Sequence, residues 1–468
     1  MEMAIGMNLK RGQDYCSHGN PIYIAYLMEI DNVTYRDLSI FNKETEFSIF
    51  QHLDFTITAG GKENLLKIFH HPLSNIQSIL EVQNVVKFLS EKETIWNPFI
   101  TNGTIIMIGE YLRNHVPVSK FSNSVFNVID LIRYKTVQAG DLAFIIFSLN
   151  HIADFFKGMN GILESFNNDD APDLLRLIYA NYKIILINDK CKEISEFDFD
   201  KEISTRAILQ FDYFFRKEFN DKVNNLIDLF YKLDAWHSMA IAVKHYNLHF
   251  PVFCNKTKPY FKAEKLFHIL LQNPVGNEIQ FDHNVNFLFL TGANMAGKST
   301  FIKAIGISVF LAHLGMGVPA DNLELSLFDG ILSNIRIQDN IIRGESYFYN
   351  EVKRIKNTIL KVKNGNNWII LIDELFTGTN AQDALICSLT VIKGLSKIRE
   401  SIFVLSTHLY EIAKDLETQQ GIIFKYFESI LENGKFRFNF NLKDGVSKDR
   451  LGYAILENES IIDLLNKI

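Results

Sequence analysis

A glycine-rich run that ends in lysine and serine holds the residues whose types and spacing could do chemistry most directly. The run reads TGANMAGKST at residues 291–300 and lies between an apolar stretch at 286–290 and another that begins at Phe301. The spacing G-x-x-x-x-G-K-S between a strand and a helix predicts a phosphate-binding loop. Glycine lets the backbone turn several N–H groups toward one phosphate, and the N-terminus of the following helix adds partial positive charge. The residues expected to contact a nucleotide are Gly292, Ala293, Asn294, Met295, Ala296, Gly297, Lys298, Ser299 and Thr300.

Two adjacent carboxylates form a second chemically capable group. Asp373 and Glu374 follow the apolar run 368–372, which is typical of a strand buried on both faces. Such charges are costly at the end of a buried strand unless they serve a cation or a water molecule. We expect Asp373 and the Ser299 hydroxyl to bind Mg²⁺, Lys298 to neutralise phosphate oxygens, and Glu374 to act as the general base.

A histidine follows a third apolar run. Residues 401–406 predict a strand that ends in Thr407 and His408. A single histidine after a strand is usually structural, but this one follows the two phosphate motifs in the expected order. We therefore expect His408 to hydrogen-bond the γ-phosphate. The sequence predicts an enzyme that hydrolyses ATP with Mg²⁺, with Lys298, Glu374 and His408 as its catalytic groups.

Different periodicities divide the chain into a helical region and a region that alternates strands with helices. Residues 31–245 carry helical periodicity, residues 246–468 alternate strand and helix patterns, and residues 1–30 form an N-terminal extension. An asparagine–glycine pair at 433–434, between 424–431 and 436–442, predicts a hairpin. One long helix with a core-facing stripe is predicted by Phe219, Val223, Leu226, Phe230, Leu233, His237 and Ala240.

Composition restricts the classes of protein and partner. The four cysteines form no C-x-x-C pair, so neither a zinc site nor a disulfide framework is indicated. The net charge of −6 is not that of a typical nucleic-acid binder, so contact with DNA would be local, topological or dependent on a partner. The most apolar stretch, 301–319, is interrupted by Lys303 and His313, and we interpret it as a buried helix rather than a membrane span. We expect an intracellular, cytoplasmic protein without a membrane.

The segment between the two phosphate motifs narrows the class of ATPase. Residues 344–352 read GESYFYNEV where transporter ATPases carry LSGGQ. This segment resembles the G-R-S-T-F-x-x-E-M signature of the MutS family of mismatch-repair ATPases. TGANMAGKST is similar to the family's TGPNMGGKST, IDELFTGTNAQD to its DE-x-G-R-G-T-S, and STHLYE to its THYxE. Residues 443–454, KDGVSKDRLGYA, resemble its V-x-x-G-x-x-x-x-S-Y-G-L-A element, and residues 31–38 and 53–66 faintly resemble its core domain.

The resemblance implies an α-helical core/lever domain at 31–245 followed by an α/β P-loop, ABC-type ATPase domain at 246–468. It implies a homodimer through the ATPase domain, with Ser346 completing the nucleotide site of the other subunit. Nucleotide state would open and close the helical arms around double-stranded or branched DNA, and other repair proteins are further partners that it suggests.

Several departures from the family pattern shape the alternatives. Glu345 and Thr377 stand where the family usually has arginines, and Val275 stands where it places an aromatic residue on the adenine. About 30 residues precede the core-like segment, so we expect no mismatch-reading domain. The alternatives are an ATPase acting on branched or recombining DNA without reading mismatches, and a nucleotide-switched protein-interaction module without DNA binding.

Basic residues at 353, 354, 356, 361 and 363 could touch DNA, although a solvated helix face is the preferred interpretation.

Overall fold

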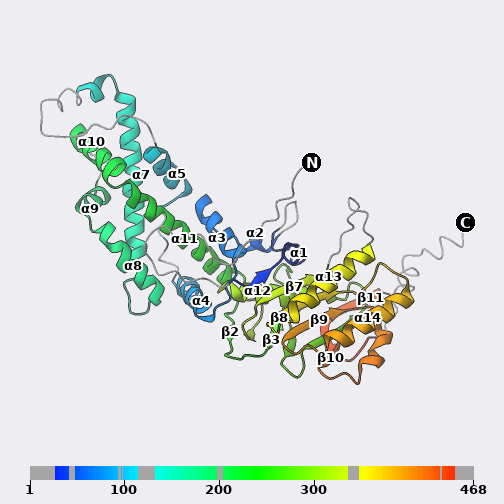
Figure 1. Cartoon of the computed structure of the whole chain (residues 1–468). Coiled ribbons are helices and arrows are strands. Elements are labelled where there is room, and N and C mark those ends of the chain that lie inside the picture. The colour runs from blue at the N-terminus through cyan, green and yellow to red at the C-terminus, as the bar shows by residue number, and fades with distance from the viewer. Residues whose placement is uncertain are drawn as a thin grey trace, which may run out of the picture.

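The computed structural model describes residues 27–41, 48–92, 96, 99–113, 132–197, 204–335, 347–432 and 435–447. Within these residues the molecule is elongated, with a helical arm that extends from one side of a region containing two sheets (Figure 1). It is a mixed helix and sheet protein, in which a mainly helical region precedes a region of alternating strands and helices, as the sequence predicts.

Helices make up the arm and its base. Their order along the chain, after the short strand β1 (Glu29–Ile30), is α1 (Asn32–Asp37), α2 (Ile49–Leu53), α3 (Ala59–His70), α4 (Ile76–Glu91), α5 (Asn102–Arg113), α7 (Ala139–Glu164), α8 (Asp173–Leu186), α9 (Asp189–Ser195), α10 (Thr205–Tyr213), the π-helix η2 (Phe214–Glu218) and α11 (Asn220–His245).

Strands alternate with helices after residue 250. The elements are β2 (Val252–Phe253), β3 (Phe261–Leu266), β4 (Asn277–Phe281), β5 (Phe287–Gly292), α12 (Lys298–His313), β6 (Asn322–Leu325), β7 (Gly330–Asn334), α13 (Tyr347–Val362), β8 (Trp368–Asp373), α14 (Ala381–Leu395), β9 (Ser401–Ser406), the 3₁₀ helix η4 (Tyr410–Leu416), β10 (Ile422–Glu432) and β11 (Lys435–Asp444).

The long helix α11 forms the spine of the arm. The stripe residues Val223, Leu226, Phe230, Leu233 and Ala240 are buried, and α11 packs against α3 and α4. This confirms the prediction of a core-facing stripe. His237 is partly buried and stacks on the ring of Trp96 at a centroid distance of 4.1 Å, so it is a packing residue of this helix.

One helix of the described chain, α7, is long and apolar enough to cross a membrane by length and composition, with 26 residues and a mean hydropathy of 1.3. In the folded chain its buried side chains pack against α5, α8, α9 and α10. This packing is that of a core helix of the arm. The stretch 301–319, expected to be a buried helix, lies in α12 and the segment after it, and α12 is buried on nearly every side.

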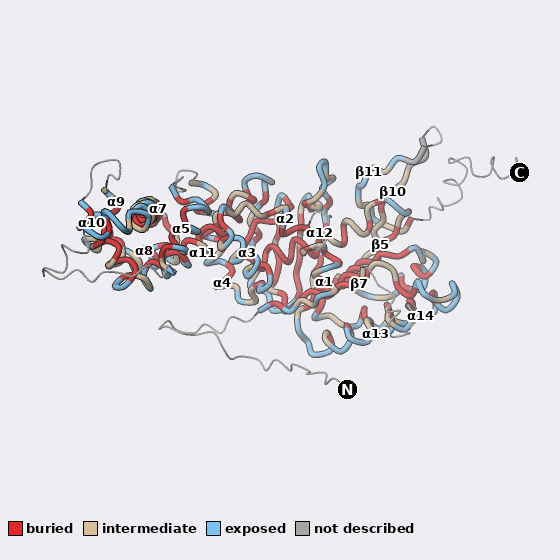
Figure 2. The backbone as a smooth tube through the Cα atoms, turned by 90° about the horizontal axis from the view of Figure 1, so that it is seen from above, coloured by how far each residue is buried: buried red, intermediate tan, exposed pale blue. Residues whose placement is uncertain are grey.

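A seven-stranded sheet in the order β1-β7-β8-β9-β5-β10-β11 positions the phosphate motifs. All neighbours are parallel except β10 and β11, which form the predicted hairpin; its residues 433–434 lie outside the described chain. Helix α12 covers one face, and α13 and α14 cover the other (Figure 2). Ile369 and Leu371 of β8 therefore pack toward α12, whereas Ile370 and Ile372 pack toward α13 and α14. Both faces are buried, which explains the continuous apolar run.

A second sheet, in the order β2-β6-β3-β4, lies beside the first. The edge strand β1 comes from the N-terminal side of the helical region, and Glu29 pairs with Gly330 in β7. The sheet is therefore completed by residues from both ends of the described chain.

Candidate nucleotide-binding site

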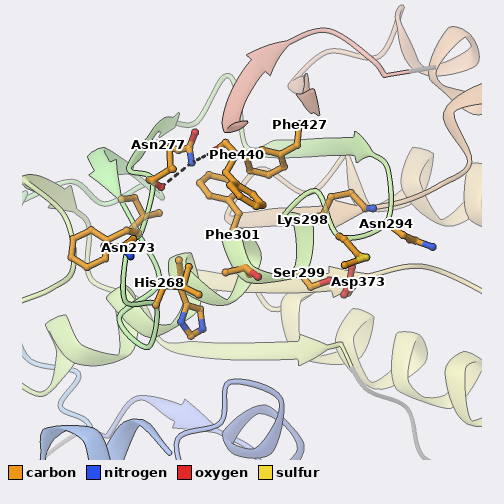
Figure 3. Close-up of a pocket in the computed structure, with 18 of the residues that line it drawn as sticks. His268, Asn273, Asn277, Asn294, Lys298, Ser299, Phe301, Asp373, Phe427 and Phe440 are labelled. Carbon is orange, nitrogen blue, oxygen red and sulfur yellow. Dashed lines mark hydrogen bonds between the residues drawn. The ribbon is translucent and has the colours of Figure 1, made fainter. Parts of the chain in front are cut away.

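The phosphate motifs meet at one edge of the seven-stranded sheet. Strands β8, β9 and β5 are parallel neighbours, so the residues that follow them come together at their carboxyl ends. A cavity of about 350 Å³ lies there, between these strand ends, the start of α12, the segment 266–277 and β11 (Figure 3). Ten of the predicted site residues line it: Val275, Asn294, Met295, Gly297, Lys298, Ser299, Thr300, Asp373, Glu374 and His408.

The loop between β5 and α12 has the backbone that a phosphate-binding loop requires. Gly292 and Gly297 have φ angles of 142° and 103°, a region that favours glycine, and Gly297 caps the N-terminus of α12. Space is also limiting at Gly292, because a Cβ atom there would lie 3.0 Å from the carbonyl oxygen of Phe427. Met295 has a φ of 67° and its side chain is 80% exposed, so the tip of the loop faces solvent.

Lys298 is buried at the base of the loop. Its Nζ donates to the carbonyl oxygens of Gly292 at 2.8 Å and Ala293 at 3.0 Å. Burial lowers the pKa of Lys298, while the negative charges of Asp373 and Glu374 oppose that shift. The ammonium group is thus held by neutral carbonyls, next to two carboxylates, where an anionic phosphate would stabilise it further.

The two carboxylates have different surroundings. Asp373 accepts a hydrogen bond from the hydroxyl of Ser406, the last residue of β9. Glu374 has a φ of 66°, and its Oε1 lies 3.0 Å from Nε2 of His408. The hydrogen bond from His408 is the main reason why the pKa of Glu374 is lowered, with further contributions from the charges of His408 and Lys298. A carboxylate that is ionised and exposed to the cavity can accept a proton from water.

The remaining residues of the predicted set lie around this centre. Gly292 and Ala293 contribute the carbonyl oxygens that hold Lys298, and Ala296 is buried beneath the loop. Ser346 and its neighbour Glu345 lie outside the described residues.

Comparison with known proteins agrees with this geometry. The family described as MutS domain V matches residues 288–463, which contain the loop, both carboxylates and His408. The DNA mismatch repair protein MutS of Petrotoga mobilis is 28% identical over 306 residues, 62% of this chain and 34% of that protein. The MutS protein of Streptococcus thermophilus is 25% identical over 273 residues, 56% of this chain and 32% of that protein. The MutS protein of Listeria welshimeri is 30% identical over 187 residues, 40% of this chain and 21% of that protein. Residues 288–463 of this chain therefore match the MutS family.

The match to MutS domain V covers only part of the cavity lining. The family match begins at residue 288, so Val275 lies outside it although it lines the same cavity. The chain spans about a third of the length of the first two of these relatives.

An aromatic residue of β11 faces the cavity and was not singled out from the sequence. Phe440 lies in a register irregularity, where Phe427 pairs with Leu442 and Ser429 pairs with Phe438, and it has a φ of 55°. Its ring points into the cavity near Phe301 and Phe427 (Figure 3). The sequence pattern of 436–442 predicts only a strand, which would not reveal this change of direction.

Asn277 of β4 holds this irregular segment in place. Its Nδ2 donates to the carbonyl oxygen of Phe440 at 3.0 Å, and its Oδ1 accepts from the N–H of Leu442 at 2.7 Å. A single side-chain amide therefore fixes β11 against the second sheet. The other cavity residues that the sequence did not indicate are mostly apolar: Leu266, Phe267, His268, Leu271, Asn273, Phe301, Ala304 and Phe427.

The donor set suits a magnesium ion that is shared with phosphate. Among the described residues, no cluster of three or more His, Cys, Asp or Glu side chains could hold a metal by itself. Ser299 and Asp373 nevertheless line the same cavity. Mg²⁺ commonly binds proteins through one or two oxygen ligands, with substrate phosphates and water completing its shell.

The basic residues of α13 do not form a free cationic face. Arg354 pairs with Asp31 and Lys361 pairs with Glu29, whereas Lys356 and Lys363 are exposed. The preferred interpretation, a solvated surface, therefore applies to the two exposed lysines. Arg354 has a role within the fold.

Proposed function

We propose that this chain binds ATP with Mg²⁺ in the cavity at the ends of β5, β8 and β9 and hydrolyses it, as an ABC-type P-loop ATPase of the MutS family. The observation that carries the proposal is the convergence of Lys298, Asp373, Glu374 and His408 on one cavity beside the glycine loop. These residues come from three separate strand ends, so no local pattern explains their meeting. Phosphoryl transfer to water requires mainly positioning and charge stabilisation, which this arrangement supplies.

Each side chain has a defined task in the proposed reaction. Lys298 would exchange its hydrogen bonds to loop carbonyls for bonds to phosphate oxygens. Glu374 would accept a proton from the attacking water, and His408, 3.0 Å away, keeps that carboxylate oriented and ionised. Ser299 and Asp373 would hold Mg²⁺, which neutralises charge on the phosphates when bound.

The opposite end of the cavity would receive the adenine. Val275 lines the cavity but offers no ring, whereas Phe440 projects an aromatic ring into it. We therefore assign the main base contact to Phe440. Aromatic side chains stack on nucleobases because both present polarisable faces.

We further propose a homodimer through the ATPase domains, in which Ser346 of one subunit completes the other site. Nucleotide state would then move the helical arms, which extend away from the sheets (Figure 1). The family supports double-stranded or branched DNA as the ligand of these arms, other repair proteins as further partners, and the cytoplasm as the location. A protein-interaction module without DNA binding is the alternative.

Two measurements test the proposal. Phosphate release from ATP should require Mg²⁺ and should vanish in Lys298→Ala, because that variant lacks the phosphate-neutralising charge. Gel-shift assays with homoduplex, mismatched and four-way-junction DNA, with and without ATP, test the DNA ligand. Hydrolysis at the same rate in Lys298→Ala would exclude this cavity as the site, and absence of binding to all three DNAs would favour the protein-interaction alternative.

A further inference from the structure

The turn that follows Glu374 holds an unfavourable backbone. Glu374 and Phe376 have φ angles of 66° and 58°, in the left-handed region. For residues other than glycine, this region brings Cβ too close to the following carbonyl oxygen. Such conformations persist only where the surrounding structure holds them, and they often lie at functional sites. Something outside the turn must therefore fix it.

Glu351 of α13 is the group that holds it. Its side chain is buried, with the residue only 2% exposed. Oε1 accepts from the N–H of Thr377 at 3.1 Å and from its hydroxyl at 3.3 Å, and Oε2 accepts from the N–H of Gly378 at 3.2 Å. Both carboxylate oxygens of a buried glutamate are thus used on two consecutive residues of the turn.

Two further observations support this connection. The rings of Phe348 in α13 and Phe376 in the turn contact each other at a centroid distance of 5.7 Å. Thr377 stands where the family resemblance expects an arginine, and here its hydroxyl supplies one of the donors to Glu351. The threonine that replaces the expected arginine at position 377 is therefore hydrogen-bonded to Glu351 in this chain.

About one turn beyond Glu351, the same helix is fastened to β7 and to the start of α1. Arg354 donates from Nε to the carbonyl oxygen of Ser333 at 3.0 Å and from Nη2 to Oδ1 of Asp31 at 3.2 Å. Asp31 is the N-cap of α1 and accepts from the N–H of Thr34 at 2.8 Å. Burial would raise the pKa of Asp31, but the hydrogen bond and charge of Arg354 lower it overall. Helix α13 thus joins the turn after Glu374 to α1 and β7, which are themselves linked where the N–H of Ser333 donates to the hydroxyl oxygen of Thr34 at 2.9 Å.

We propose that Glu351 is a positioning residue for hydrolysis: it fixes the turn that carries Glu374 and makes the placement of that base depend on α13. The inference rests on the proposed ATPase function. Because Arg354 anchors α13 to Asp31 and to Ser333 of β7, the helix that carries Glu351 is itself held in place against the sheet. Glu351 is not among the residues that line the cavity, so its loss affects the chemical step and leaves phosphate binding at Lys298 in place.

Steady-state kinetics of three variants test the positioning role. Glu351→Gln keeps the size of the side chain but sets an amide donor against backbone N–H donors, so we expect kcat to fall about 10- to 100-fold with KM for ATP within about threefold. Thr377→Val removes only the hydroxyl bond, and we expect a fall of about two- to fivefold. Lys356→Gln, an exposed change on the same helix, is the matched control and should retain wild-type kcat.

Hydrogen exchange without nucleotide gives a readout that does not require hydrolysis. The amides of Thr377 and Gly378 should exchange at least about fivefold faster in Glu351→Gln than in the wild type or Lys356→Gln, since each lost bond costs about 1 kcal/mol or more, which is about fivefold. If Glu351→Gln does not fold, Thr377→Val carries the test through kcat and exchange. Unchanged exchange, or faster exchange with unchanged kcat, would overturn the inference. Absence of hydrolysis in the wild type would instead count against the proposed function.

Discussion

The imidazole of His408 lies with Nε2 3.0 Å from Oε1 of Glu374, and the same nitrogen lies 3.4 Å from Nζ of Lys298. One histidine after β9 therefore contacts both the proposed base after β8 and the lysine that begins α12. A group that binds between Lys298 and Glu374 would meet His408 as well. We therefore expect the three side chains to act as a unit.

The first prediction concerns the chemical step. Glu374→Gln should bind ATP as the wild type does, because Lys298 and the glycine loop are unchanged, but hydrolysis should fall by about two or more orders of magnitude, as for loss of a general base. Binding can be followed with a fluorescent ATP analogue and hydrolysis by phosphate release. Turnover near the wild-type rate would remove Glu374 from the mechanism.

The second prediction concerns assembly. If Ser346 reaches the nucleotide of the other subunit, ATP should drive dimerisation of the Glu374→Gln variant, in which hydrolysis is blocked. Adding Ser346→Arg should abolish this dimerisation by introducing bulk and positive charge where the composite site closes. Sedimentation velocity with and without ATP distinguishes monomer from dimer. The same mass for both proteins in both conditions would contradict a composite site.

Much of the site could be predicted because its chemistry is encoded locally. The strands at 287–292, 368–373 and 401–406 each appear as a short apolar run followed by polar residues, and parallel pairing brings those residues to one edge. Buried parallel strands need apolar residues on both faces, so their sequence signal is strong.

Other features depend on contacts between distant segments. The pairing of Glu29 with Gly330 and the bond from Thr377 to Glu351 leave no periodic signal, because each is a single contact across the fold. Phe440 turns toward the cavity through an irregular register and a φ of 55°, which an alternating strand pattern does not indicate. Such features required the three-dimensional structure.

The third prediction follows from Phe440. Removing its ring in Phe440→Ala should weaken ATP binding about tenfold, within the range of about 1–3 kcal/mol for stacking of a base on an aromatic side chain. Phe440→Tyr keeps a ring and should bind ATP as the wild type does. Inorganic tripolyphosphate has no base, so its affinity should be the same in all three proteins. Equal ATP affinity in wild type and Phe440→Ala would show that the base lies elsewhere.

The last prediction concerns acid stability and rests on His313, at the end of α12. The residue is fully buried; its Nδ1 lies 2.6 Å from the carbonyl oxygen of Leu73, and its Nε2 lies 3.4 Å from the backbone nitrogen of Phe328. Nδ1 must therefore donate and Nε2 must accept, which requires a neutral ring. Burial accordingly lowers the pKa of His313 from 6.5 to about 4.

The direction of the effect follows from the two pKa values. Between pH 6.5 and about 4 the unfolded chain binds a proton at His313 that the folded chain does not. Its contribution to stability is complete above pH 6.5 and is lost as the pH falls toward 4, by about 3 kcal/mol in total. In His313→Asn the free energy of unfolding should be lower at pH 7.5, because packing is lost, but its decrease from pH 7.5 to pH 5 should be smaller than in the wild type. Urea unfolding at both pH values measures this difference. An equal pH dependence in the two proteins would mean that His313 does not link proton binding to the junction between α12 and the helical region.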